Sequence, residues 1–150
     1  MACLETYATL RIFSASQPPD KVGRILGLQG TVSKPRNPNS RYRHERERHY
    51  WAWSTAGVDQ TTDGLSHIGT LIDALRGKES CLQKLREMDC EIDVCCYWVS
   101  SGQGGPFLDG SSLSALAQLG LDIWWDVYFG DPSEYGDAAK ETAASVGAKL

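Results

Sequence analysis

Carboxylates and large aromatic side chains alternate with apolar residues along two segments of the sequence, 91–99 and 121–129. Successive side chains of a β-strand point to opposite faces of a sheet, so each segment would gather its polar and aromatic set on one face. A third predicted strand, 6–13, adds Tyr7 and a basic residue if the strands are neighbours. The side chains expected to share this surface and to contact a partner are Arg11, Asp93, Tyr97, Asp122, Trp124, Asp126 and Tyr128.

Three of these carboxylates, Asp93, Asp122 and Asp126, are candidates for acid–base catalysis or for binding a hard divalent cation through oxygen. Carboxylates on a solvated sheet face more commonly keep a protein soluble. We therefore expect no catalytic residue, no metal site and no cofactor here.

An exposed aromatic and acidic face is better suited to binding another protein. Each large apolar side chain left in water forgoes about 1.5–3 kcal/mol of burial free energy. Interfaces use Tyr and Trp as anchors, and carboxylates around them select a partner with a basic surface. The alternative is that the loop 33–48 or the C-terminal tail folds over this face and makes it a second core.

Arginines are concentrated in one segment. Residues 34–50 contain six basic and two acidic residues, a local charge of +4, which leaves nine basic and seventeen acidic residues elsewhere, or −8. One interpretation is a phosphate or RNA contact with aromatic stacking. The other, which we favour, is that the arginines are solvated or pair with the acidic sheet face. The residues concerned are Arg41, Arg43, Arg46 and Arg48.

Other chemical motifs are weak. The loop 102–107 lacks the final glycine of a dinucleotide-binding fingerprint, and it follows no predicted parallel unit. His67 is placed on the polar side of a helix, and a pairing of Cys96 with His49 through folding is left open. The five cysteines include no Cys-x-x-Cys pair, so we expect reduced thiols.

The apolar periodicity predicts the elements that position these residues. Strands are expected at 6–13, 49–55, 91–99 and 121–129, with Leu121, Ile123, Trp125, Val127 and Phe129 on the core side of the last. Helices are expected after Ser16, within 61–88, where Gly77 either divides the segment into two helices or kinks one long helix, and after a Ser111 or Ser112 cap. Clean alternation favours an α+β fold with a mostly antiparallel sheet and helices packed on one face, a ferredoxin-like arrangement with additions.

Length and composition set the class. The chain has 150 residues, 41% hydrophobic and 23% charged, and this composition excludes wholesale disorder. The net charge of −4 argues against a general nucleic-acid binder. One α+β domain is expected over 1–130, followed by a tail, 131–150, that is partly disordered or a short helix. No apolar run is long enough to span a membrane and no leader pattern is present, so we expect a cytoplasmic protein.

Several segments together resemble a known family. They are Tyr7–Ser14, Gly27-Leu28, the arginine-bearing loop before Trp53, Cys90–Trp98, the glycine-rich loop, and Leu119 to Tyr128. In this order and spacing, over roughly residues 5 to 130, the chain resembles the bacterial domain-of-unknown-function family numbered 4279. The resemblance implies no catalytic residues, because no activity is assigned to that family.

The sequence thus leads to three hypotheses. The first is a small non-catalytic protein-binding domain, most concretely an immunity protein that neutralises a toxin or effector by masking its basic surface. The second is a small-molecule or nucleotide enzyme with a site between the sheet and the arginine-rich loop. The third is an RNA-binding module that uses that loop.

Overall fold

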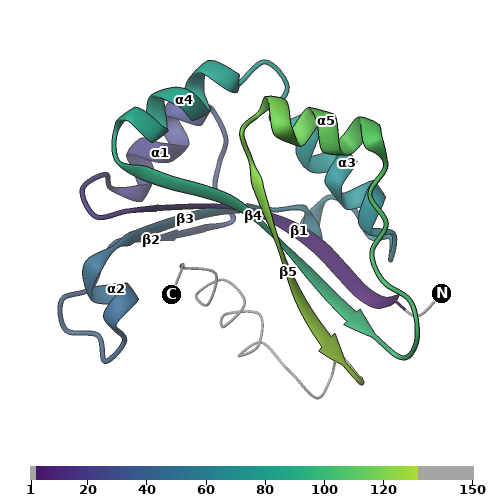
Figure 1. Ribbon diagram of the computed structural model, residues 1–150. Helices are drawn as coiled ribbons and strands as arrows, with labels where there is room; N and C mark the ends of the chain where they lie inside the picture. The colour runs from purple at the N-terminus through teal and green to yellow at the C-terminus, as the bar shows by residue number, and fades with distance from the viewer. Residues whose placement is uncertain (1–2, 132–150) are drawn as a thin grey trace.

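The computed structural model describes residues 3–131, and these form one five-stranded sheet with helices against it (Figure 1). The predicted tail therefore lies outside the described residues, apart from Asp131. The strand order across the sheet is β2-β3-β1-β4-β5. The strands are β1 (Cys3–Ser14), β2 (Val32–Lys34), β3 (His49–Ser54), β4 (Cys90–Ser100) and β5 (Asp122–Phe129).

The predicted α+β class with a mostly antiparallel sheet is confirmed. β1 pairs antiparallel with β3 and β4, and β3 pairs antiparallel with β2. β5 instead runs parallel to β4, and the connection between them passes through helix α5 (Gly110–Gln118). Parallel neighbours require such a crossover. The glycine-rich loop therefore does follow a strand of a parallel unit, contrary to the prediction, and the ferredoxin-like detail is not confirmed.

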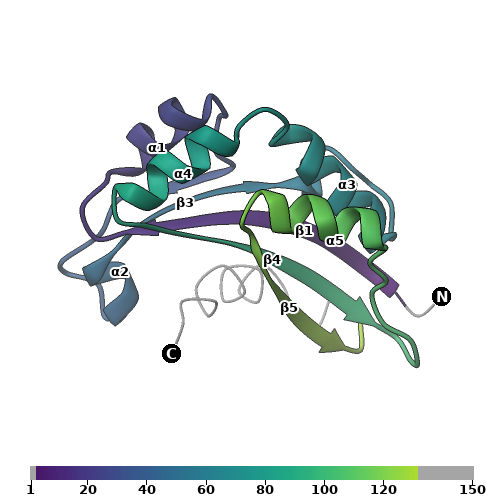
Figure 2. The same cartoon turned by 45° about the horizontal axis from the view of Figure 1, so that its top comes forward.

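Four helices cover one face of the sheet: α1 (Pro19–Leu26), α3 (Gly64–Ala74), α4 (Glu79–Glu87) and α5, as Figures 1 and 2 show. The short helix α2 (Arg43–Glu47) lies beside the β2–β3 end of the sheet, and a 3-10 turn, η1 (Thr55–Gly57), follows β3. We call the opposite face of the sheet the second face.

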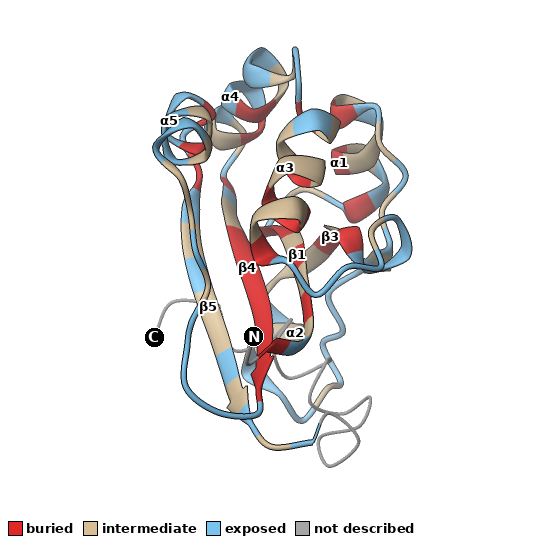
Figure 3. Cartoon of the chain, turned by 90° about the vertical axis from the view of Figure 1, so that its right-hand side faces the viewer, coloured by how far each residue is buried: buried red, intermediate tan, exposed pale blue. Residues whose placement is uncertain are grey.

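The main core lies between the sheet and these helices. Ala8, Leu10 and Ile12 of β1 are at most 1% exposed and belong to this core, as their spacing predicts. The helices contribute apolar residues at helical spacing, among them Ile68 and Leu71 of α3. Figure 3 shows the resulting gradient, with β1 and β4 buried at the centre and β5 largely half-buried or exposed at the edge.

Local sequence signals set the ends of these helices. α1 ends at Gly27 and the break between α3 and α4 falls at Gly77, with φ of 66° and 76°, a region that glycine adopts without a steric penalty. The predicted serine cap of α5 is wrong, because the Asp109 carboxylate caps the helix by accepting a hydrogen bond from the Ser112 amide. The segment 33–48, predicted as a loop, contains the last two residues of β2 and all of α2.

Candidate functional site

The strand register brings the predicted site residues onto the second face in transverse rows. Arg11 lies opposite Asp93, which lies opposite Asp122. The next rows along β4 pair Cys95 with Trp124 and Tyr97 with Asp126. Tyr7 of β1 lies opposite Tyr97 of β4. Tyr128 of β5 lies one row further along, opposite Val99 of β4. The seven residues predicted to share a face are therefore neighbours in space.

The centre of this face is buried. The Arg11 side chain is 0% exposed and donates two hydrogen bonds to Asp93, from Nε at 2.7 Å and from a terminal nitrogen at 2.8 Å. The guanidinium also lies 5.5 Å from the centroid of the Phe13 ring. Burial raises the pKa of Asp93, and the hydrogen bonds from Arg11 offset only part of that rise. This geometry makes Arg11 and Asp93 a structural ion pair, and the expectation that Arg11 is exposed is wrong.

A tyrosine cluster, Tyr7, Tyr97 and Tyr128, begins two rows further along the same face. The ring centroids of Tyr7 and Tyr97 are 4.7 Å apart in a stacked arrangement, and those of Tyr97 and Tyr128 are 5.4 Å apart. Tyr97 is 1% exposed and forms a second small hydrophobic cluster with Val99. Burial raises the pKa of Tyr128 to about 12. The expectation that Tyr97 is exposed is therefore wrong, and at this point the second face is a second core.

The exposed part of the face is β5. Asp122 is exposed, and Trp124 retains 42% of its accessible surface. Asp126 is half-buried and accepts a hydrogen bond from the Tyr128 hydroxyl at 3.2 Å, and burial raises its pKa. Asp122 and Trp124 are thus the predicted site residues most accessible to a partner.

Two further exposed apolar residues were not among the predicted site residues. Val127 and Phe129 are 42% and 70% exposed, although the alternation places them on the core side of β5. In Figures 1 and 3 the C-terminal part of β5 runs away from α5, so this helix does not cover their side chains. The sequence contains no signal for this, because the position of α5 along the strand depends on how the connecting loop folds.

The arginine-rich segment makes mostly local contacts. Arg43 donates to Glu47 of the same helix at 2.8 Å, and Arg46 donates to the Ser40 carbonyl at 2.9 Å. Arg41 lies 4.7 Å from the ring centroid of Tyr42, its neighbour. These three arginines are exposed.

Arg48 behaves differently from the other three. It donates to Glu91 of β4 at 3.2 Å and lies 4.7 Å from the centroid of the Phe13 ring. Arg48 thus pairs with an acidic residue of the sheet, as in the interpretation favoured from the sequence. The contact is at the end of β1 away from the tyrosine cluster, since Phe13 pairs with Glu91 and Tyr7 with Tyr97.

His67 lies in a buried network, where the sequence placed it on a polar helix face. Its Nε2 lies 2.9 Å from the Thr61 carbonyl oxygen, which can only accept, so Nε2 carries the proton. In the neutral ring, Nδ1, 2.6 Å from Thr55 Oγ1, accepts from that hydroxyl, while Thr55 Oγ1 accepts from the Ala8 amide at 2.9 Å. Asp59 lies 3.8 Å from Nε2.

This threonine–histidine–aspartate order is that of a nucleophile, a base and an orienting acid. Thr55 is 0% exposed, so no substrate can reach its hydroxyl. The network instead joins η1 to β1 and α3. The Cys96 and His49 pairing left open above does not form, because Cys96 pairs with Ala8 and His49 with Ser14 at separate positions along β1.

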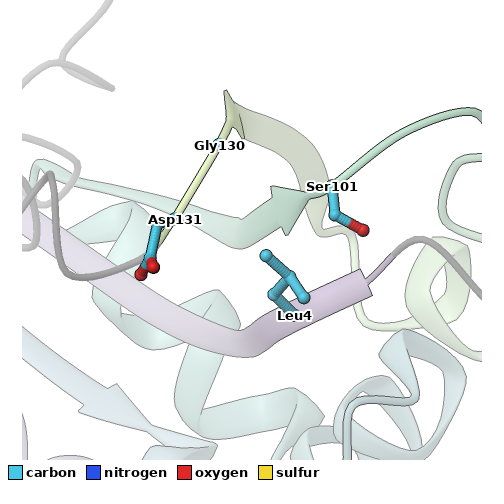
Figure 4. A pocket seen from close by; sticks show the side chains of 4 residues that line it. All are labelled: Leu4, Ser101, Gly130 and Asp131. Carbon is cyan, nitrogen blue, oxygen red and sulfur yellow. The ribbon is translucent and has the colours of Figure 1, made fainter.

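The described residues offer little for a cofactor or metal. Within 3–131, no three His, Cys, Asp or Glu side chains come together in a metal-binding arrangement. A shallow hollow of about 540 Å³ is lined by Leu4, Ser101, Gly130 and Asp131 (Figure 4). It lies where β1 begins and β5 ends, whereas the arginine-rich segment lies near the other end of β1.

No helix among the described residues is long and apolar enough to cross a membrane.

Comparison with known proteins identifies the family of the chain. No curated protein and no solved structure matches the chain. The model of one family, described as "Domain of unknown function (DUF4279)", matches residues 4–130, which is most of the sequence. The chain therefore belongs to this family of domains of unknown function.

Proposed function

We propose that this chain is a non-catalytic protein-binding domain that holds a partner with a basic surface along β5. The observation that supports this most directly is the exposure of Trp124, at 42%, on an edge strand between two carboxylates, Asp122 and Asp126. Val127 and Phe129 enlarge the apolar surface available at the same strand.

The charge distribution supports a basic partner. β5 contains two carboxylates and no basic residue. The basic side chain nearest in register, Arg11, already makes two hydrogen bonds to Asp93. Partner arginines or lysines would therefore meet carboxylates at β5, and such complementarity accelerates encounter and rejects acidic partners.

The residue types also support binding. Hot spots of protein interfaces are rich in Trp and Tyr, and they lie where the partner excludes water around them. Trp124 supplies an aromatic anchor, and the partly buried tyrosine cluster in the neighbouring rows supplies a packed base that would limit its movement. A rigid surface loses less conformational entropy when it binds.

The most concrete form of this proposal is an immunity protein that neutralises a toxin or effector in the cytoplasm. Such a protein must mask a basic, substrate-binding surface, and a small acidic domain is suited to that task. This step rests on analogy of size and charge.

Affinity purification from the native host, followed by mass spectrometry, tests the proposal. The bait is the full chain, compared with the double variant Trp124→Ala/Asp126→Asn. A matched control, Phe107→Ala/Glu87→Gln, removes an exposed aromatic ring and a charge elsewhere. We expect a basic protein that the wild type and the control retain and the double variant loses, with calorimetry confirming the loss.

Unchanged affinity in a folded Trp124→Ala/Asp126→Asn variant would contradict the proposed surface. The two other hypotheses give different results. An enzyme site predicts a rise in melting temperature with nucleotides, phosphosugars or divalent metals. RNA binding through Arg41, Arg43, Arg46 and Arg48 predicts gel shifts that weaken steeply as salt rises.

A further inference from the structure

The outer edge of β5 differs from the other edge of the sheet. β2, at the opposite edge, has three residues and ends in Lys34. β5 has eight residues in unbroken register with β4, and it contains no proline, lysine or arginine. Proteins commonly protect sheet edges with short strands, lysine, proline or bulges, because an open edge can pair with another strand. Among the described residues no strand pairs with the outer edge of β5.

The hydrogen-bonding direction of β5 can be assigned from its end. The Gly130 amide donates to the Ser100 carbonyl at 3.0 Å, so Gly130 faces β4. In a parallel pair, alternate residues direct both N–H and C=O to the same neighbour. Trp125 and Val127 therefore direct their backbone groups away from β4, toward the outer edge.

The side chains beside this edge differ in chemistry between the two faces. Asp122, Trp124 and Asp126 lie on the second face, and Val127 and Phe129 lie on the other. A strand added at this edge would alternate its own side chains in the same way. Basic residues on one face would meet the carboxylates, and apolar residues on the other would cover Val127 and Phe129.

We propose that the partner binds by adding a β-strand of alternating basic and apolar residues to the outer edge of β5, which rests on the protein-binding function proposed above. The backbone of the added strand pairs with Trp125 and Val127, and its side chains select the register. Main-chain hydrogen bonds supply affinity and alternate side chains supply specificity in this mode of recognition.

The carboxylates disfavour a second copy of the same chain in the antiparallel register centred on Trp124. If two β5 strands paired antiparallel about Trp124, Asp126 of one copy would face Asp122 of the other. Like charges directly opposite one another destabilise a strand pair. A basic strand turns the same positions into attractive contacts.

The probe is a synthetic peptide of alternating lysine and valine, matched to the eight residues of β5 and titrated into the full chain by calorimetry. A glutamate–valine peptide and a lysine–valine peptide of identical composition in two blocks are the controls. We expect only the alternating lysine peptide to bind, and Asp122→Asn/Asp126→Asn to weaken it.

Two changes separate backbone pairing from side-chain contact. Val127→Pro removes one outward amide without removing a bond to β4, whereas Val127→Ala removes only side-chain atoms. We expect Val127→Pro to lower affinity about tenfold or more, and Val127→Ala to change it less.

The second change is made in the peptide and leaves the protein intact, so it does not depend on the folding of Val127→Pro. The lysine–valine peptide is N-methylated either at every lysine or at every valine. One edge of a strand carries the amides of alternate residues, so one methylated peptide should lose binding and the other should retain it. Loss in both, or in neither, contradicts strand addition, as does equal binding of the glutamate peptide.

Two other occupants would also contradict the proposal. Concentration-dependent dimerisation of the chain that Val127→Pro abolishes would identify a second copy. Peptide binding seen only after removal of residues 132–150 would identify the tail as the occupant of this edge. If a native partner requires Trp124 and Asp126 but binds Val127→Pro normally, strand addition fails and the proposed function stands. If no partner depends on Trp124 and Asp126, the proposed function fails whatever the peptides do.

Discussion

Arg11 and Asp93 lie directly opposite one another on β1 and β4, and two hydrogen bonds of 2.7 and 2.8 Å join them on the second face. The arginine side chain is 0% exposed and the aspartate side chain 13% exposed. Removing a guanidinium and a carboxylate from water is unfavourable, and only this paired geometry offsets it. The pair therefore constrains the register between the two central strands.

Substitution of one member should destabilise the fold far more than substitution of both. Asp93→Leu leaves the Arg11 charge buried without its partner, and loss of one partner of a buried pair typically costs about 3–5 kcal/mol. Arg11→Met/Asp93→Leu removes both charges and should recover much of that loss. Urea denaturation of the single and double variants measures the free energies of unfolding.

A control comes from the exposed pair Arg24 and Asp20, 3.7 Å apart, where Asp20→Ala should have little effect on unfolding. Additive effects of the Arg11 and Asp93 substitutions would show that the two side chains are not coupled.

Gly30→Ala should destabilise the main core. A Cβ atom at this position would lie 2.5 Å from Nε1 of Trp51, and Trp51 is 2% exposed and has little room to move. Overpacking of this kind costs roughly 1–3 kcal/mol. The matched variant is Gly57→Ala, whose added Cβ meets nothing within 4 Å. Equal midpoints of thermal unfolding for the two variants would show that the Trp51 ring can adjust.

Asp59 should make stability depend on acid pH. Hydrogen bonds from the Ser66 hydroxyl and the Thr61 amide lower the pKa of Asp59 from 3.8 to about 2. Because the folded-state pKa lies below the unfolded value, the contribution is complete above about pH 4 and is lost as pH falls toward 2.

The comparison is between the wild type and Asp59→Asn, by urea denaturation at a series of pH values. The difference in their free energies of unfolding should shrink as pH falls from about 4 to 2. Ser66→Ala, which removes the hydrogen bond of 2.6 Å, should make this pH dependence smaller. A difference that stays constant over the range would rule out this role of Asp59.

Cys95 should react slowly with alkylating reagents. Burial raises the pKa of Cys95 from 9.0 to about 11, which reduces the reactive thiolate roughly 100-fold at pH 8. Cys81 is only half-buried and should be modified first in the native protein. Mass spectrometry of iodoacetamide-treated protein measures the order of labelling, with urea-unfolded protein as the control. Labelling of Cys95 before Cys81 would contradict this assignment.

Much of the fold could be predicted from periodicity alone. Alternation over 6–13 placed Ala8, Leu10 and Ile12 on the core face, and they lie there. The helical period over 61–88 and the glycine at 77 predicted α3 and α4 with a break between them. These features are local, because the side-chain direction along a strand or helix follows from backbone geometry within a few residues. The same alternation correctly gathered Asp93, Tyr97, Trp124 and Asp126 on one face.

Only the tertiary structure decided which of those residues meet solvent. Arg11 and Tyr97 carry the same sequence signal as Trp124, yet the first two are buried at the centre of the sheet and Trp124 is exposed at its edge. Exposure depends on strand order, and the parallel placement of β5 beside β4 follows from the path of α5 between them. The divergence of the C-terminal part of β5 from α5 likewise exposes Val127 and Phe129. Sequence thus determined the face to which each side chain points, and long-range packing determined which part of that face a partner can reach.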